Sequence, residues 1–243
     1  MVEKIKKTPL KVAVMNNMSI AKSNNLIDAS YKLNVQAQKL VLACLGKIDS
    51  RPDKNVTKEI SITALEFSEM MGIDIKNAHR ELYKATDALF KSSIILRDEN
   101  EEIELRWIQM KVKKLKGEGA VRLMWSDEVL KYISQLQSRF TTYKLRSIAN
   151  LQSSHSIRIY ELLMKFNSTG ERVIYLEDFK SALGIADKYH QFKDLNKWVI
   201  KPSIKELNLR SDLEIKFETI KKGRSVAALS FEFKKSAQLK MDI

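Results

Sequence analysis

The chain has 243 residues, of which 44% are hydrophobic and 30% charged, as expected for one large or two small folded domains. The low content of 7 glycines and 3 prolines argues against a low-complexity or linker-rich organisation. The net charge of +13 favours a polyanionic partner, nucleic acid first and an acidic membrane second. Charge alone leaves open a solvated basic surface that has no specific partner.

The single cysteine, Cys44, excludes a disulfide framework within the chain and fits a reducing compartment. It lies on an apolar helical stripe, where a buried thiol is expected. No apolar stretch is long enough to cross a bilayer, and the lysines near the N-terminus are not followed by the apolar region of a signal peptide. We therefore expect a cytoplasmic protein that has no membrane partner.

The first part of the chain predicts a basic arm followed by a mixed helical and β unit. Residues 1–24 are rich in lysine and lack a hydrophobic period, which predicts a flexible arm with a short strand near Lys11–Met15. Thr63 and Glu66 have the capping-box spacing of a helix that ends at Gly72. In chain order, we expect a helix over 30–48, a strand over 59–63, helices over 64–72 and 75–92, and strands over 94–97, 103–115 and 120–125.

A long helix is expected to connect the two halves of the chain. Ser126 is a favourable N-cap residue, and Asp127 and Glu128 suit the first turn of a helix. Apolar residues at helical spacing continue this helix to about residue 150. We accordingly expect one domain over 25–150, including the connector helix 126–150, and a second over 151–243.

The second half repeats the order of the first. Its pattern predicts a helix over 154–167, a strand over 171–175, a short helix over 177–183, a longer helix over 189–208 and a final β-hairpin. Four positions also match at a constant offset: Phe67, Met71, Gly72 and Ile73 against Phe179, Leu183, Gly184 and Ile185. This repetition favours an α+β fold of two tandem winged-helix domains related by pseudo-duplication, each a helical core with a small antiparallel sheet and a hairpin wing.

No group of residues in the chain suggests catalysis. The three histidines, His79, His155 and His190, lie far apart in sequence and have no metal-ligand spacing. Neither a phosphate-binding loop nor a dinucleotide fingerprint is present in the sequence. We therefore expect a protein that is not an enzyme and that uses no cofactor and no metal.

The helix expected over 189–208 is the best candidate for DNA binding. Its lysines spread over about 120° of a helical wheel, since steps of four residues drift by about 40° each. They are Lys193, Lys197, Lys201 and Lys205. The opposite side carries Phe192, Leu195, Trp198 and Val199. One face can therefore enter the core while the other meets DNA in the major groove.

Proline makes the two halves of this lysine series unequal. Pro202 lacks a backbone donor and disfavours helical geometry at Lys201, so we expect a kink there. Lys193 and Lys197 are therefore expected to be better DNA contacts than Lys201 and Lys205. We expect Trp198 to anchor the helix to the core, although an aromatic side chain here could also stack on a base.

Further candidates lie on the hairpin and in the first domain. The turn that carries Lys221, Lys222 and Arg224 predicts a cationic wing. Tyr189 is a candidate for stacking on a base, and Arg158 could reach a phosphate from the start of its helix. In the first domain the equivalent helix carries Lys76, His79, Arg80 and Lys84, of which Arg80 is best shaped for a guanine contact. A solvated cationic face is the alternative for both helices.

Three stretches together resemble plasmid replication initiators of the iteron-binding Rep type. The first begins Asn25-Leu-Ile-Asp-Ala-Ser-Tyr31, and the second is Ser156-Ile-Arg-Ile-Tyr-Glu-Leu-Leu163. The third combines Tyr189, Phe192, Leu195, Val199, Pro202, Glu206, Leu207 and Asn208 with the hairpin that ends Leu229-Ser-Phe-Glu-Phe233. The resemblance covers about Asn25 to Lys235 and implies two winged-helix domains.

The resemblance implies a specific function and specific partners. Such proteins bind direct repeats in the double-stranded DNA of a plasmid origin and initiate replication. They recruit the host initiator protein and the replicative helicase, often form homodimers through the first domain, and repress their own gene as dimers. The alternatives are a winged-helix transcriptional regulator without a replication role, a strand-nicking enzyme, and a basic scaffold that has no preference for repeat DNA.

Overall fold

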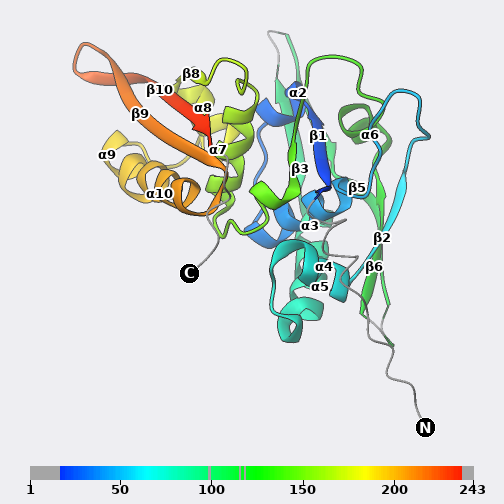
Figure 1. The fold of residues 1–243 in the computed structure, drawn as a ribbon. Coiled ribbons are helices and arrows are strands. Elements are labelled where there is room, and N and C mark those ends of the chain that lie inside the picture. Colours follow the sequence, from blue (N-terminus) through cyan, green and yellow to red (C-terminus); the bar gives the residue numbers. More distant parts are fainter. Residues whose placement is uncertain (1–16, 98–99, 115, 118, 237–243) are drawn as a thin grey trace.

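The computed structural model describes residues 17–97, 100–114, 116–117 and 119–236. Most of the arm predicted over 1–24, including the strand near Lys11–Met15, lies outside these residues. Two helix-and-sheet units occupy the two halves of the chain and pack side by side (Figure 1). Among the described helices, none is both long and apolar enough to cross a membrane.

The first unit is a winged helix that contains an inserted hairpin. Its elements are α3 (Val35–Leu45), β2 (Glu59–Thr63), α4 (Ala64–Met71), α5 (Ile75–Lys91), the inserted strands β3 (Ser93–Arg97) and β4 (Glu102–Arg106), and then β5 (Ile108–Lys113) and β6 (Ala120–Trp125). The antiparallel sheet has the order β2-β6-β5. The single strand predicted over 103–115 is therefore two strands, which separate at the buried side chain of Trp107.

The second unit has the same topology. Its elements are α7 (Ser154–Met164), β8 (Glu171–Tyr175), α8 (Leu176–Ala182), α9 (Phe192–Leu195), the π-helical turn η2 (Asn196–Ile200), α10 (Lys201–Arg210), β9 (Leu213–Lys222) and β10 (Ser225–Lys235). The sheet order is β8-β10-β9, so the last strand again lies in the centre, between the first and second. The shared order confirms the prediction of two tandem winged helices.

The residues that match between the two units have the same structural roles. Phe67 and Phe179 are both buried, and Gly72 and Gly184 both end their helices with positive φ, +60° and +67°. Such values favour glycine, which has no Cβ to clash. The predicted capping box is present, since Thr63 Oγ1 accepts from the Glu66 amide at 3.1 Å while the Glu66 carboxylate accepts from the Thr63 amide at 2.8 Å.

The connector helix predicted over 126–150 is wrong beyond Ile133. Helix α6 covers only Asp127–Ile133, and the chain then turns through Gln135 and Arg139, both with positive φ. Residues Phe140–Lys144 form strand β7, which is followed by the short 3-10 turn Leu145–Ser147. Alternating burial along β7 shows the two-residue period of a strand, which the apolar spacing had concealed.

The end of the predicted arm is also part of the fold. Strand β1 (Ser19–Ser23) pairs antiparallel with β7, and helix α2 (Asn24–Asp28) follows it directly. Ile20 is fully buried, and the side chain of Lys22 is only 3% exposed. Residues 19–24 were therefore wrongly included in a flexible arm. Their partner strand was not recognisable because β7 was itself predicted as helix.

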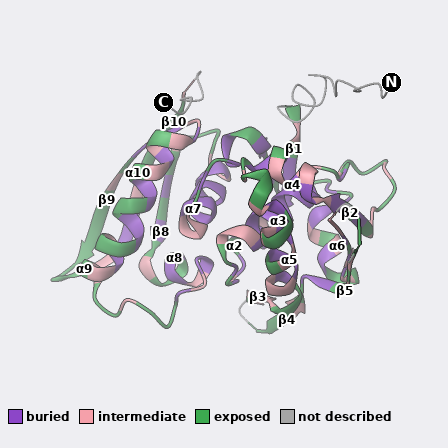
Figure 2. Ribbon diagram, turned by 90° about the horizontal axis from the view of Figure 1, so that it is seen from below, coloured by how far each residue is buried: buried purple, intermediate pink, exposed green. Residues whose placement is uncertain are grey.

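A buried ionic cluster joins these strands to the second unit. Glu161 on α7 pairs with Lys22 on β1 at 2.6 Å and with Arg158 at 2.9 Å. The hydroxyl groups of Tyr143 and Tyr31 donate to the same carboxylate, at 2.6 and 3.3 Å. Figure 2 shows the buried faces of α3 and α7 in the middle of the molecule, where the two units meet. Because a buried charge is tolerated only when paired, this cluster fixes how the units pack.

Candidate nucleic-acid interface

The predicted lysine-bearing helix is present in the second unit, in three segments. Helix α9, the π turn and α10 run without interruption from Phe192 to Arg210. Leu195, Val199 and Leu207 are fully buried beneath them. The four lysines of the predicted series, Lys193, Lys197, Lys201 and Lys205, are all exposed. The expected division of the helix into a core face and a cationic face is therefore confirmed.

Proline is accommodated by the π turn and causes no break. Pro202 lies at the start of α10, and the Lys201 amide bonds back to the Asn196 carbonyl across the wider turn. A turn that holds one more residue cancels part of the 40° drift that α-helical steps of about four residues produce. Lys197 and Lys201 therefore lie closer to one line than in a regular helix, and exposure does not separate the first two lysines from the last two.

Trp198 lies on the cationic face, contrary to the expectation that it anchors the helix to the core. Its side chain is 60% exposed, and Lys197 Nζ lies 4.5 Å from the centre of its ring. The π turn changes the angular positions of residues 196–200, so Val199 and Ile200 take the core positions instead. The sequence contained only an indirect signal of this change, the proline that follows the turn.

Tyr189 occupies the loop that leads into α9, outside the helix in which it was predicted. Its backbone has a positive φ of +52°, and its half-buried ring packs against the core. Its ring is therefore less free to stack on a base than that of Trp198. The loop places Tyr189 beside Lys188 and close to the start of α7, at the boundary between the units.

The predicted wing is present as the hairpin β9–β10. Lys221 and Lys222 end β9, and Gly223 and Arg224 form the turn, all four being exposed. Gly223 has a φ of +64°, which suits a tight two-residue connection. The wing extends away from the body of the molecule beside α9 (Figure 1). The second unit thus presents a cationic helix and a cationic hairpin on adjoining surfaces.

The first unit presents a shorter cationic face on α5. Lys76, His79, Arg80 and Lys84 are exposed there. The Arg80 guanidinium is held within the helix, by Glu81 at 3.1 Å and by Asn77 at 2.9 Å. Exposed ion pairs of this kind contribute at most about 1 kcal/mol, so a stronger partner can release Arg80.

Strand β5 carries two further lysines that the prediction did not include. Lys111 and Lys113 both bond to Asp87 of α5, each at 2.5 Å. These bonds hold the pKa of the Asp87 carboxyl below its usual value. The first wing is thereby tied to its helix and partly neutralised, which makes the first unit the weaker cationic surface.

Arg158 is the one predicted DNA contact that the structure contradicts. Its side chain is 1% exposed, and its guanidinium donates to Glu161 and to the carbonyls of Ile27, Ala29 and Ala182. It also lies over the Tyr31 ring at 3.9 Å. An arginine with all its donors engaged inside the protein cannot reach a phosphate, so Arg158 is structural.

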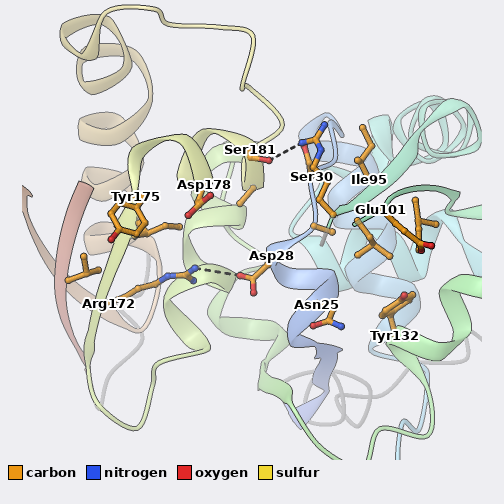
Figure 3. A pocket seen from close by; sticks show the side chains of 17 residues that line it. Asn25, Asp28, Ser30, Ile95, Glu101, Tyr132, Arg172, Tyr175, Asp178 and Ser181 are labelled. Carbon is orange, nitrogen blue, oxygen red and sulfur yellow. Dashed lines mark hydrogen bonds and ion pairs between the residues drawn. The ribbon is translucent and has the colours of Figure 1, made fainter. Parts of the chain in front are cut away.

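A cleft also lies between the two units, and an ion pair and a hydrogen bond link its walls. It measures about 650 Å³ and lies between α2, the hairpin β3–β4 and the strand β8 (Figure 3). Asp28 is paired across it with Arg172 at 3.5 Å, and Arg97 donates to Ser181 at 3.3 Å. Elsewhere in the described parts of the chain, no group of His, Cys, Asp or Glu could hold a metal ion. Burial raises the pKa of the Cys44 thiol to about 12, so this thiol is not a nucleophile at neutral pH.

Two winged helices in tandem, each with an exposed cationic helix beside a hairpin, define a DNA-binding protein of the winged-helix class. The chain belongs to the initiator replication protein family. The family's first winged helix, WH1, matches residues 19–164 of this chain, and the family's second winged helix, WH2, matches residues 175–233. The first match thus extends through α7, and the domain boundary predicted near residue 150 stays a prediction.

Two curated proteins and one solved structure are similar to this chain. A replication initiation protein of Escherichia coli is 31% identical over 236 residues, covering 93% of this chain and 72% of the relative. An uncharacterized 27.6 kDa protein of Escherichia coli is 21% identical and covers 85% of this chain and 92% of its own length. The crystal structure of the Pi initiator protein in complex with iteron DNA has the same fold, with a TM-score of 0.79, 24% identity, and coverage of 92% of this chain and 99% of that one.

Proposed function

We propose that this protein binds short direct repeats in the double-stranded DNA of a plasmid origin and thereby initiates replication of the plasmid. The observation that carries this proposal is the duplicated reading unit, a cationic helix beside a hairpin, in a chain of the initiator replication family. The related Pi initiator was crystallised with iteron DNA, which supports the same class of ligand.

The proposed DNA surface of the second unit combines charge with one aromatic side chain. Lys193, Lys197 and Lys201 would neutralise phosphates, and Trp198 would make an apolar contact in the major groove. The wing residues Lys221, Lys222 and Arg224 would contact the adjoining backbone. In the first unit Lys76, His79 and Lys84 would contact phosphates, and Arg80 would contact a guanine once Glu81 releases it.

The family resemblance supports further partners. We infer that the protein forms homodimers through the first domain and that the dimer represses its own gene at an inverted repeat. On the same basis we infer contacts with the host initiator protein and the replicative helicase. Sedimentation of the purified protein at several concentrations tests the dimer, and a single monomeric species at all of them would remove it.

Binding to repeat DNA tests the main proposal. A duplex selected by the protein from a random pool should contain a repeat of about 20 bp, which is two adjacent major-groove segments. The protein should then bind this duplex at least about a thousandfold more tightly than a scrambled one. Equal affinity for both would support the basic scaffold instead.

A transcriptional regulator of the same fold is the second candidate. Both functions require specific DNA binding, so binding alone does not separate them. A plasmid that carries the repeats but lacks its own initiator should replicate when this protein is supplied, as the proposal requires. A regulator would repress a reporter gene but would not maintain the plasmid.

We propose that initiation by this protein involves no strand cleavage. Incubation of a supercoiled plasmid that carries the repeats with the protein and Mg²⁺ should leave the plasmid supercoiled. Nicked circles that appear with wild-type protein would make it an enzyme.

A further inference from the structure

A small cationic pocket lies where the two units meet, and no predicted DNA contact except Tyr189 belongs to it. It measures about 240 Å³. Lys32 and Asn34 of the first unit line one side, and Ser154, His155, Lys188 and Tyr189 of the second line the other. None of the residues that line it is acidic, so its charge is positive on both sides.

Two helices of the fold also begin at this pocket. Asn34 is the N-cap of α3, and its side chain accepts from the Ala37 amide at 2.8 Å. Ser153, beside the lining residue Ser154, is the N-cap of α7 and accepts from the Ser156 amide at 3.4 Å. Both helices have 11 residues, and the partial positive charge of each N-terminus adds to that of the lysines.

His155 is a half-buried titratable group inside this pocket. Burial and the neighbouring Lys188 both lower the pKa of its imidazole. The charged groups that face it are Lys188, from the loop before α9, and Lys32, from the segment before α3, together with the titratable hydroxyl of Tyr189. The acidic neighbour of Lys188 in the chain, Asp187, is exposed and does not line the pocket. An anion placed here would offset both lysines and favour the protonated imidazole.

The pocket lies between the two helices proposed to read DNA. Tyr189 leads directly into α9, and α3, which begins at the pocket, packs against α5. In Figure 2, α9 lies beyond α7 on one side of the molecule, and α5 lies beside α3 on the other. A duplex that contacts both reading helices would have to pass the boundary between the units, where the pocket lies.

Close packing fixes the pocket to one arrangement of the units. Gly184, next to the lining residue Leu183, lies against the backbone of Tyr31 and Lys32. A Cβ atom at position 184 would be 2.5 Å from the Tyr31 carbonyl oxygen. The two walls therefore come together only when the units pack as they do in this structure.

We propose that this interdomain pocket binds one backbone phosphate of the DNA, between the segments read by the two domains, and that His155 takes up a proton when the phosphate binds. The inference rests on the proposed function and adds to it a contact shared by both domains. One phosphate held by both domains would favour DNA binding in this packed arrangement over any other.

Salt dependence tests the phosphate contact. The double variant Lys32→Gln/Lys188→Gln removes two exposed charges from the pocket, and Lys131→Gln/Lys234→Gln removes two exposed charges elsewhere. On the selected repeat duplex, the pocket variant should bind more weakly, and its slope of log K against log salt should be smaller by about 0.9, the value for one phosphate. The control pair should keep the wild-type slope. A wild-type slope in the pocket variant would overturn the inference.

The pH dependence tests the role of His155. Wild-type protein should bind the duplex more tightly at pH 6 than at pH 8, because the complex holds a proton that the free protein lacks. His155→Gln should lose this part of the pH dependence, whereas His190→Gln, an exposed histidine outside the pocket, should keep it. An unchanged pH profile in His155→Gln would show that no proton is taken up there.

Two further arms separate the possible outcomes. If wild-type protein does not distinguish the repeat from scrambled duplex, the proposed function fails; if it does and the pocket variants match it, only this inference fails. Inorganic phosphate is also added, without DNA, to wild-type protein and to the pocket variant, and the thermal midpoint of unfolding is measured for each. This arm detects a site for free anions. If phosphate stabilises wild-type protein but not the pocket variant, and both bind the repeat duplex equally well, the pocket binds free anions and the proposed DNA contact is overturned. Circular dichroism should show that every variant is folded.

Discussion

At the scale of single residues, Glu161 is the most critical charge in the fold. Burial alone would raise the pKa of its carboxyl, but the charges of Lys22 and Arg158 and its hydrogen bonds overcome this effect and lower the pKa. The carboxylate is fully buried, so all of its compensation comes from within the protein. Its charge is therefore required for the stability of both units.

Removing this charge should destabilise the protein strongly. Glu161→Gln leaves Lys22 and Arg158 buried without a counter-charge, and we expect a loss of about 3–5 kcal/mol in the free energy of unfolding. Glu128→Gln, at a side chain that is 56% exposed and that pairs with the exposed Lys131, is the matched control and should change it by less than about 0.5 kcal/mol. Urea unfolding measures both; an equal effect of the two changes would contradict the role of the cluster.

The same group predicts how stability depends on pH. Because the pKa of Glu161 is lower in the folded chain than in the unfolded one, its contribution is complete above the unfolded value and is lost as pH falls through the folded value. Wild-type protein should therefore lose stability in acid once the pH falls below about 4.3, the ordinary pKa of a glutamate in an unfolded chain. Thermal midpoints of a folded Glu161→Gln variant should show a smaller loss over this range, and an identical acid profile would contradict the assignment.

Trp198 is expected to be the aromatic contact of the DNA surface. Trp107 and Trp125 are fully buried, so among the three tryptophans Trp198 is the one open to a collisional quencher. Repeat DNA should protect it from quenching, and Trp198→Ala should cost about 2 kcal/mol in binding, as truncation of an aromatic anchor typically does. The salt slope should not change, since no charge is removed. Unprotected fluorescence in a saturated complex would place Trp198 away from the DNA.

At the scale of elements, the π turn is the feature that shapes the reading helix. It accommodates Pro202, keeps Lys197 and Lys201 close to one line and exposes Trp198. Irregular turns of this kind recur at functional positions in helices. The helix that was expected to kink at its proline thus runs on through the π turn and carries exposed lysines on both sides of it.

Charge removal on this helix tests its role. Lys193→Ala with Lys197→Ala should weaken binding to the repeat and reduce the salt slope by up to about 1.8, or about 0.9 for each phosphate that is no longer neutralised. Lys131→Ala with Lys234→Ala removes the same charge from exposed positions outside the proposed DNA surface. Electrophoretic mobility shifts over a range of salt concentrations measure both. Equal losses of affinity in the two variants would remove the assignment of the reading helix.

Several elements could be predicted from the sequence because a local signal specified them. Thr63 with Glu66, and the glycines at 72 and 184, fixed helix ends through caps and positive φ. Strand β6 and the hairpin of the second unit show a clear alternation of apolar and polar residues. The exposed lysines of the reading helix followed from their four-residue spacing alone.

Other features depended on partners far away in the chain. Strand β7 carries Phe140 and Tyr143 at a spacing that also suits a helix, and only pairing with β1 decides between the two. Arg158 lies near the start of its helix, from where it could have reached a phosphate, but carbonyls of Ile27 and Ala182 and the Tyr31 ring enclose it. The exposure of Trp198 depends on one wider turn, which helical periodicity does not reveal.

At the scale of the whole molecule, duplication explains how a small protein can bind an extended site. Two linked units on adjacent grooves gain affinity because binding of the first raises the effective concentration of the second. The buried cluster around Glu161 and the contact at Gly184 hold the units together, so their spacing is set before DNA binds. Because the distance between the two units is fixed before binding, we expect the protein to prefer DNA in which the two half-sites are one particular distance apart.

The measurement that tests the account most directly is binding to the selected repeat and to a scrambled duplex over a range of salt concentrations. Wild-type protein should prefer the repeat by at least about a thousandfold, and log K should fall with log salt by about 0.9 for each phosphate neutralised. Insertion of about 5 bp between the two half-sites, half a helical turn, should abolish the preference. Salt-insensitive binding, or equal affinity for both duplexes, would contradict the claim that this protein is an initiator that binds origin DNA through two winged-helix domains.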